Sequence, residues 1–308
     1  MPNHYLRIVF LAAVAAAALV SPAAGADNML GSFFGKTDTA AKKVSLAERR
    51  DAPAPAAALA ESDALFFTAA PRETAEEGAA LYGPIAEYLA QTIGRKVVYR
   101  HPRTWGAYRT EMLNGAYDLV FDGPHFNSYR AQKLSHNILV KIPTGHEFVA
   151  IVKKDEAFAS AREMVGRTFC AHAPPNLGTL ILLGQFDNPA RQPMILNTEG
   201  WDRIYDGVVS GRCTGGVLPL ANLKKLDKEG RTKIVYQARA IPNQALSAGP
   251  RVTAKEQALI VEALLAPEAA GPTEKLRAAY KVGERLAVTS NREYAGLADY
   301  LKTEWGFY

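Results

Sequence analysis

Cysteine is scarce in this sequence, since Cys170 and Cys213 are the only two among 308 residues. Two cysteines cannot build a disulfide-dense scaffold, and no CxxC or CxxCH motif is present. Neither a CxxC metal cluster nor covalent haem attachment is therefore indicated. The pair leaves three possibilities open, namely one disulfide, two buried free thiols, or a soft-metal or metalloid site. An export signal, described below, favours the disulfide because exported proteins fold in an oxidising compartment.

Long runs of one charge are also missing. The chain has 36 Lys and Arg against 31 Asp and Glu, which gives a formal net charge of +5. This mild balance, without a basic run, argues against a nucleic-acid partner. It does suit the attraction of small anions. The apolar run at residues 8–20 is shorter than the ~20 residues that a membrane-spanning helix needs.

Catalytic motifs are the third absence. The sequence has no nucleophile elbow, no phosphate-binding P-loop and no Ser–His–Asp order, and no paired general acid and base stands out. We therefore expect neither an enzyme nor a bound cofactor.

The N-terminus has the form of a secretory signal. Arg7 precedes the apolar run 8–20, and the small residues 24–26 fit a cleavage site. We predict a cleavable signal peptide at 1–26, with no lipid attachment because no cysteine stands at the cleavage point. Residues 27–62 lack hydrophobic periodicity and are predicted to be a flexible leader.

From residue 63 onward, strand and helix patterns alternate. Strands are predicted at 64–68, 96–100, 118–121, 138–143 and 147–153, with helices at 73–92, 105–114 and 122–134. A second unit has strands at 168–171, 192–197, 213–218 and 232–237, with helices at 178–186, 201–210 and 219–228. Helices at 253–265, with Thr253 as N-cap, and at 273–280 and 292–304 complete the chain.

This alternation predicts an α/β protein with two open sheets. The second unit returns toward the first near residues 243–252. We therefore predict two lobes around a central cleft. The first comprises residues 63–151 together with 241–308, and the second comprises residues 152–240.

Ligands of open α/β sheets bind outside the carboxyl ends of the strands, which selects candidate residues. At the end of the strand 168–171, Pro174 and Pro175 cannot continue a ladder, and Asn176 is a predicted helix N-cap. An ordinary strand-to-helix turn without a ligand is the alternative there. The candidate ligand-binding residues are Thr68, Arg72, Trp105, Asp122, His125, His146, Glu147, His172, Asn176, Gly178 and Thr179.

These residue types are compatible with two kinds of ligand. Thr68, Arg72 and Thr179 could donate hydrogen bonds to an oxyanion, together with N–H groups at helix starts. The histidines at positions 125, 146 and 172, with Glu147, could hold a divalent metal or, when protonated, an anion. The spacing of these residues is not that of a compact metal motif, so no metal is expected.

Asp122 and the aromatic residues have further alternatives. Asp122 could cap the turn at Gly123 or support a ligand-binding residue from behind. Trp105 and Tyr108 could enclose an organic part of a ligand or pack beneath the lobe.

Four segments, in this order and spacing, resemble one known family. They are ALFFTAAPRETAEEGAALYGPIAEYLAQTIGRKV, LNGAYDLVFDGPHFN, VKKDEAFASAREMVGRTFCAHAPPNLGTL and GVVSGRCTGGVLP. The family comprises the periplasmic solute-binding proteins of ABC importers, in the phosphate/phosphonate-binding group with the type II periplasmic binding fold. The resemblance covers residues 64–265.

The resemblance implies a periplasmic, monomeric protein that binds a small oxyanion between two lobes and delivers it to an ABC permease. Alternatives are a ligand sensor that signals to a membrane kinase, and a metal or redox accessory protein that uses the histidines and cysteines. The first and third strands of such a lobe are commonly neighbours, which implies a bond between Cys170 and Cys213.

The sequence departs from the family at two places. The family loop D-P-x-S-x-S-G is replaced by residues 173–179, APPNLGT, which lack its serines, and the aspartate of the family strand G-x-x-D-A-G is replaced by Cys213. The family's scaffold is therefore implied more strongly than its ligand.

Overall fold

The computed structural model describes residues 63–283, 285–304 and 307. The predicted signal peptide 1–26 and leader 27–62 lie outside the described residues. Within the described part, no helix is both long and apolar enough to cross a membrane.

The first sheet has six strands in the order β11-β4-β10-β3-β1-β2. β1 lies parallel to β2 and β3, whereas β10 is antiparallel to its neighbours β3 and β4. The strands are β1 (Leu65–Ala69), β2 (Val97–Tyr99), β3 (Leu119–Asp122), β4 (Asn137–Lys141), β10 (Ala245–Ala248) and β11 (Ala287–Val288).

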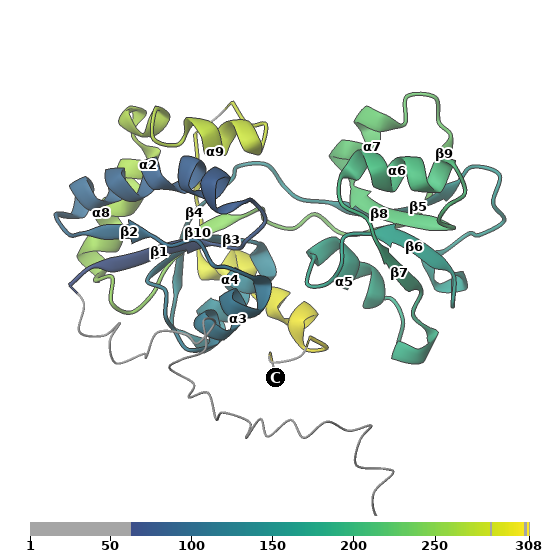
Figure 1. Ribbon diagram of the computed structural model, residues 1–308, viewed down its shortest axis with the longest axis horizontal. Helices are drawn as coiled ribbons and strands as arrows, with labels where there is room; N and C mark the ends of the chain where they lie inside the picture. The colour runs from purple at the N-terminus through teal and green to yellow at the C-terminus, as the bar shows by residue number, and fades with distance from the viewer. Residues whose placement is uncertain (1–62, 284, 305–306, 308) are drawn as a thin grey trace, which may run out of the picture. The chain divides into compact units, whose positions relative to one another are not determined.

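Helices cover both faces of this first sheet (Figure 1). α2 (Ala75–Ile93), α8 (Ala254–Leu265) and α9 (Glu274–Ala279) pack on one face. α3 (Trp105–Leu113) and α4 (Pro124–Lys133) pack on the other. Both α2 and α8 begin with a capping box, formed by Thr74 with Glu77 and by Thr253 with Glu256, which confirms Thr253 as N-cap.

The second sheet has five strands in the order β7-β6-β8-β5-β9. They are β5 (Phe148–Lys153), β6 (Thr168–Ala171), β7 (Met194–Asn197), β8 (Gly215–Pro219) and β9 (Thr232–Gln237). α6 (Trp201–Val209) and α7 (Leu220–Leu226) pack on one face, and α5 (Leu177–Leu183) packs on the other (Figure 1). We call the two sheets with their helices the first and second lobes.

Two chain segments connect the lobes, 142–147 between β4 and β5 and 238–244 between β9 and β10. They run side by side, because His146 and Ile241 exchange backbone hydrogen bonds of 2.9 and 3.0 Å. The Ile142 N–H also donates to the Gln244 carbonyl at 2.9 Å.

The structure corrects three expectations. β5 pairs with β8 and β9 along its whole length, so residues 148–151 lie in the second lobe and not in the first. β10 and β11 were not predicted, because they are short and carry few β-branched residues. The predicted helix 292–304 is replaced by two 3₁₀ helices, η5 (Asn291–Tyr294) and η6 (Leu297–Leu301).

The C-terminal correction has a local cause. Gly296, between η5 and η6, has φ of 80°, which is not a helical conformation. The remaining short 3₁₀ helices are η2 (Ala161–Glu163), η3 (Pro189–Arg191) and η4 (Pro267–Ala270).

Candidate functional site

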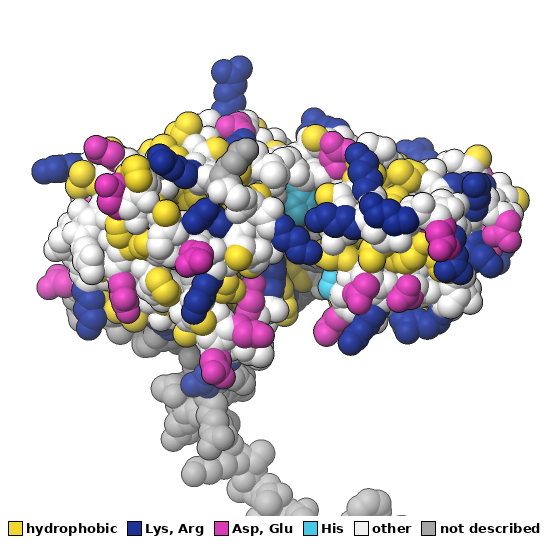
Figure 2. Space-filling view, turned by 90° about the horizontal axis from the view of Figure 1, so that it is seen from above, with side chains coloured by type: hydrophobic (Ala, Val, Ile, Leu, Met, Phe, Trp, Pro, Cys, Tyr) yellow, Lys and Arg dark blue, Asp and Glu magenta, His cyan; other side chains and the backbone are white. Residues whose placement is uncertain are grey.

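A cavity of about 560 Å³ lies where loops at the carboxyl ends of strands from both lobes meet. In Figure 2, histidine side chains are visible in a hollow, with lysine and arginine side chains beside it. The lining residues are Pro71, Arg72, Trp105, Gly123, Pro124, His125, Phe126, His146, Phe148, His172, Ala173, Pro174, Pro175, Asn176, Leu177, Asn197, Glu199, Trp201 and Gln244.

A buried carboxylate supports the first-lobe wall of the cavity. Asp122, at the end of β3, is fully buried, and its Oδ1 accepts from Arg72 Nη2 at 2.7 Å and from the Gly123 N–H at 2.6 Å. Its Oδ2 accepts from Arg130 Nη2 at 3.0 Å and from the Tyr108 hydroxyl. We call Arg72, Tyr108, Asp122 and Arg130 the Asp122 cluster.

The charges of this cluster favour the ionised forms. Burial by itself raises the pKa of Asp122. The charges of Arg130 and Arg72 lower it, and together with the hydrogen bonds they outweigh the effect of burial, so the pKa of Asp122 lies below the ordinary value. Burial lowers the pKa of Arg72, but the charge of Asp122 raises it, and the net pKa lies above the ordinary value. Both side chains are therefore charged at neutral pH.

Arg72 is the member of the cluster that reaches the cavity. Its side chain is 28% exposed, and its Cζ lies 5.9 Å from the centroid of the Trp105 ring. Trp105 begins α3, which Thr104 caps by accepting from the Ala107 N–H. The wall therefore combines a fixed guanidinium with an aromatic face.

His125 lies in the first turn of α4 and contacts the second lobe. Its Nε2 is 3.0 Å from the Pro175 carbonyl, and since a carbonyl only accepts, Nε2 carries the proton. Its Nδ1 is buried and has no hydrogen-bond partner in the described part of the chain. Burial lowers the pKa of His125 to about 4, so the ring is neutral at pH 7.

The other two histidines of the cavity are also shifted toward the neutral form. Burial lowers the pKa of both His146 and His172. His146 Nδ1 lies 3.1 Å from Asn243 Oδ1, and the His172 ring packs edge-on against Trp201. At neutral pH the three imidazoles of the site are thus neutral. The sequence had also allowed protonated histidines that bind an anion.

The start of α4 adds donors to the first-lobe wall. Its cap residue is Gly123, which has no side chain to bind the first-turn N–H groups, and Pro124 follows. N–H groups at a helix N-terminus attract anions when nothing else binds them. In the second lobe, Asn176 Oδ1 accepts from the Gly178 N–H at 3.0 Å, which confirms the predicted N-cap of α5.

Six of the eleven candidate residues line the cavity, and five do not. Arg72, Trp105, His125, His146, His172 and Asn176 line it. Thr68 is fully buried and donates to the Arg100 carbonyl at 2.8 Å, and Thr179 is buried and donates to the His172 carbonyl. Glu147 accepts from Gln237 at 3.1 Å. Gly178, against the Phe148 ring, and Asp122, behind Arg72, do not line it either.

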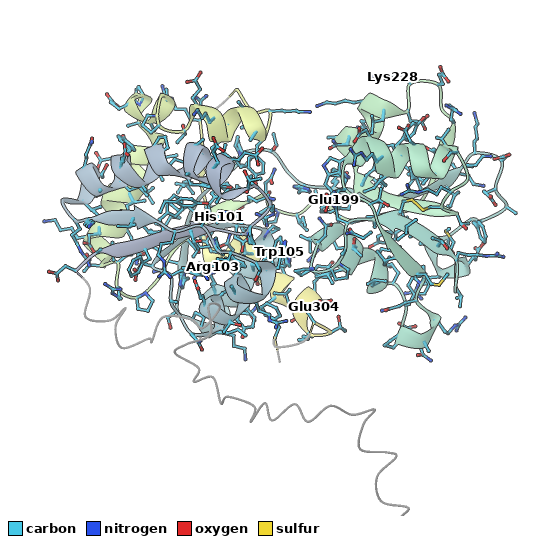
Figure 3. All side chains as sticks on the ribbon, in the orientation of Figure 1. His101, Arg103, Trp105, Glu199, Lys228 and Glu304 are labelled. Carbon is cyan, nitrogen blue, oxygen red and sulfur yellow. A yellow bond between two sulfur atoms is a disulfide. The ribbon has the colours of Figure 1, made fainter. Side chains whose placement is uncertain are left out.

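Sequence reasoning missed part of the lining, including Asn197, Glu199 and Trp201. The rule of strand carboxyl ends, applied to the strand ending at Asn197, would have found these three. Glu199 follows β7 and is labelled in Figure 3 together with Trp105. Gln244 lies in the second connecting segment, and its Oε1 is buried without a partner among the described residues.

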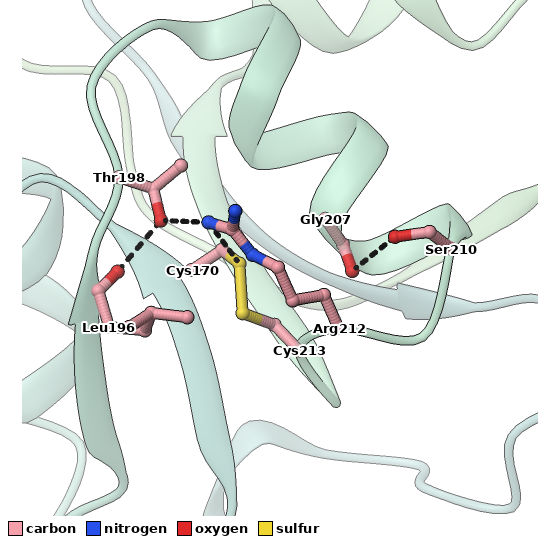
Figure 4. The surroundings of a disulfide bond; sticks show 7 residues. All are labelled: Cys170, Leu196, Thr198, Gly207, Ser210, Arg212 and Cys213. Carbon is pink, nitrogen blue, oxygen red and sulfur yellow. Dashed lines mark hydrogen bonds between the residues drawn. A yellow bond between two sulfur atoms is a disulfide. The ribbon is translucent and has the colours of Figure 1, made fainter.

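The cysteines form a disulfide, as predicted (Figure 4). Cys170 of β6 and Cys213, before β8, have Cα atoms 5.6 Å apart, and both are buried. Beside them, Arg212 Nη2 donates to Thr198 Oγ1 at 3.0 Å, and the Thr198 N–H donates to the Ala171 carbonyl at 2.9 Å. This arrangement joins the starts of two loops that line the cavity.

Metal binding finds no support in the described residues. No group of three or more His, Cys, Asp or Glu side chains is placed there to hold a metal ion. The histidines and Glu147 are thus not brought together as ligands, and both cysteines are used in the disulfide.

Comparison with known proteins gives a consistent result. The model of the family described as "ABC transporter, phosphonate, periplasmic substrate-binding protein" matches residues 67–294. Among curated proteins, none matches the sequence significantly.

Several solved structures have a similar fold, including the following three. A Xanthomonas citri protein bound to ATP has a TM-score of 0.62 at 11% identity and covers 78% of this chain and 97% of its own. PhnD1 from Prochlorococcus marinus with methylphosphonate has a TM-score of 0.58 at 13% identity, covering 78% and 97%. A binding protein component of an ABC phosphonate transporter from Pseudomonas aeruginosa has a TM-score of 0.53 at 12% identity, covering 76% and 84%. At these identities the likeness establishes the type II periplasmic binding fold.

Proposed function

We propose that this chain, which belongs to the family of periplasmic substrate-binding proteins of phosphonate ABC transporters, binds the phosphonate group of its solute between Arg72 and the first turn of α4. Members of this family are solute-binding components of transporters and not enzymes. The observation that carries the proposal is the position of Arg72, a charged guanidinium held at the cavity wall by the fully buried Asp122.

The chemistry of the wall suits a phosphorus oxyanion. A guanidinium and first-turn N–H groups together make charge-assisted hydrogen bonds to several oxygens. A volume of about 560 Å³ also accommodates an organic substituent, which Trp105, Phe126 and Trp201 would enclose. The ligand we favour is therefore an organic phosphonate. The structure of PhnD1 with methylphosphonate, which shares the fold, is consistent with this choice.

The family implies a small anionic solute and a membrane permease as partners. We propose that the protein acts as a monomer, that residues 1–26 are removed on export, and that the lobes close over the solute by motion of the connecting segments. In this proposal the lobes are residues 63–141 with 245–308 and residues 148–237, separated by those segments.

Titration calorimetry with methylphosphonate, inorganic phosphate, phosphite and sulfate tests the proposal. Arg72→Met should weaken methylphosphonate binding by at least about tenfold, since it removes a charged hydrogen-bond donor. Arg95→Met is the matched control, because Arg95 is also paired with one carboxylate, Glu256, and is 31% exposed, but does not line the cavity. The proposed function would be contradicted if Arg72→Met bound methylphosphonate with wild-type affinity, or if the wild type bound none of these anions.

A further inference from the structure

The Asp122 cluster contains more positive than negative charge. One carboxylate, Asp122, lies between two guanidinium groups, with Arg72 at 2.7 Å and Arg130 at 3.0 Å. In the described part of the chain, neither arginine is within ion-pair distance of another carboxylate. The cluster therefore carries a net charge of about +1.

Arg130 is the buried one of the two arginines. Its side chain is 1% exposed, and its Nε and Nη1 have no hydrogen-bond partner among the described residues. Its Cζ lies 5.6 Å from the centroid of the Tyr108 ring. A charge surrounded by protein is screened much less than a charge at the surface, so it acts over a longer distance.

The charge of Arg130 reaches residues of the cavity. Burial is the main cause of the low pKa of His125. The charge of Asp122 and the hydrogen bond to the Pro175 carbonyl raise this pKa, and the charges of Arg72 and Arg130 make smaller contributions that lower it. His125 lines the cavity, whereas Arg130 does not. Arg130 therefore contributes to the potential at the site without touching a ligand.

Two nearby carboxylates oppose this potential. Glu199 lines the cavity, and its charge raises the pKa of His172, although burial keeps that pKa below its ordinary value. Glu199 is exposed, so water screens its charge more than the charge of a buried group. Glu73 follows Arg72 in the chain, does not line the cavity, and has a pKa raised mainly by burial, which disfavours its charged form.

From this arrangement we infer that Arg130, and not Arg72 alone, makes the cavity cationic. Asp122 neutralises one guanidinium while it positions Arg72, and the second guanidinium leaves the excess charge that attracts the anion. This inference rests on the proposed function, because it concerns the affinity of the same cavity for an anion. Arg130 thus acts on the ligand through its charge and does not contact it.

Three variants separate charge from hydrogen bonding. Arg130→Met removes the charge, and Arg130→Lys keeps it. Tyr108→Phe removes a neutral hydroxyl that donates to the same oxygen of Asp122 and accepts from Arg130 Nη2. The dissociation constant for methylphosphonate is measured by calorimetry at low and high salt. Arg130→Met should weaken binding on the order of tenfold at low salt, the effect of one charge at roughly 10 Å with an effective dielectric constant of about 20.

The salt dependence distinguishes an electrostatic role from a structural one. Arg130→Met should bind with a shallower dependence on ionic strength, whereas Arg130→Lys and Tyr108→Phe should keep the wild-type dependence. Equal losses in all three variants, or an unchanged affinity and salt dependence in Arg130→Met, would overturn the inference. Arg130→Gln, which keeps a donor to Asp122, replaces the methionine variant if that variant does not fold.

A measurement without ligand keeps the inference separate from the proposed function. The imidazole of His125 is titrated by nuclear magnetic resonance in the ligand-free protein. Arg130→Met should raise the pKa of His125, because a nearby cation is lost, and Arg130→Lys should not. An unchanged pKa of His125 in Arg130→Met overturns the inference even if methylphosphonate binds, and a raised one supports it even if no tested anion binds.

Discussion

At the scale of single residues, the first-lobe wall of the cavity depends on Asp122. A carboxylate without water around it is tolerated only when charged partners and donors surround it, and Asp122 has two arginines, a hydroxyl and a backbone N–H. The same contacts hold Arg72 in one position. When a long side chain is already fixed before binding, less conformational entropy is lost as the ligand binds.

His125 makes stability depend on pH. Its pKa is about 4 in the folded chain and about 6.5 when unfolded, so at acidic pH the unfolded chain gains a proton that the folded chain does not. Above pH 6.5 His125 is neutral in both states and does not change the free energy of unfolding. As pH falls from 6.5 toward 4, protonation of the unfolded chain lowers the free energy of unfolding. The loss should amount to about 3 kcal/mol.

The comparison of wild type with His125→Gln isolates this effect, because glutamine does not titrate and all other histidines are common to both chains. Chemical denaturation at pH 7, 5.5 and 4 should show the wild type losing about 3 kcal/mol more than the variant between pH 7 and 4. Parallel losses in the two proteins would mean that His125 is not the group responsible.

At the scale of elements, α5 lies unusually close to the second sheet. A Cβ built on Gly178 would lie 2.5 Å from Phe148 Cδ1 and 3.1 Å from Val217 Cγ1. Gly178→Ala should therefore lower the free energy of unfolding by about 1–3 kcal/mol, the usual cost of overpacking a core. Because Phe148 also lines the cavity, the variant should weaken anion binding as well.

Gly106 in α3 provides the matched control for this prediction. A Cβ there would meet only Thr104 Oγ1, at 3.7 Å, which is an ordinary contact. Gly106→Ala should leave stability unchanged or increase it by up to ~1 kcal/mol, since alanine favours helix more than glycine does. Denaturant unfolding of both variants decides the matter, and equal stability of the two alanine variants would contradict the close packing of α5.

Most helices and strands could be predicted from the sequence because their signals are local. The caps Thr253 and Asn176 and the break at Pro174 lie within a few residues of the boundaries that they set. β10 could not be predicted, because its four residues, ALSA, form a strand only between β3 and β4. Pairing with distant strands supplies what the local sequence lacks.

At the scale of the whole molecule, the cavity needs both lobes. The first lobe contributes residues 123–126 and the second contributes residues 172–177, and His125 and Pro175 are in hydrogen-bond contact. Methylphosphonate should therefore slow amide hydrogen exchange in both segments at once. Helix α8, which does not line the cavity, should exchange at an unchanged rate.

Hydrogen exchange with mass spectrometry, with and without methylphosphonate, provides this measurement. Protection confined to one of the two segments would place the ligand on a single lobe, and protection of α8 alone would place it elsewhere.

The candidate site was predictable only in part. Strand ends identified Arg72, Trp105 and His125, because the carboxyl edge of a parallel sheet collects ligand-facing residues. The roles of these side chains were not predictable. Thr68 has a suitable type and position, yet its hydroxyl is used by the Arg100 carbonyl.

The sequence by itself determined most of the strands and helices, their approximate ends and the family to which the chain belongs, because these depend on residues close together in the chain. Only the tertiary structure decided the charge and the lining of the cavity. Asp122 meets Arg72, Tyr108 and Arg130 across separations of 50, 14 and 8 residues. The burial of Asp122 and its contacts with two arginines exist only once the lobe has folded. These contacts create the excess positive charge of the cluster.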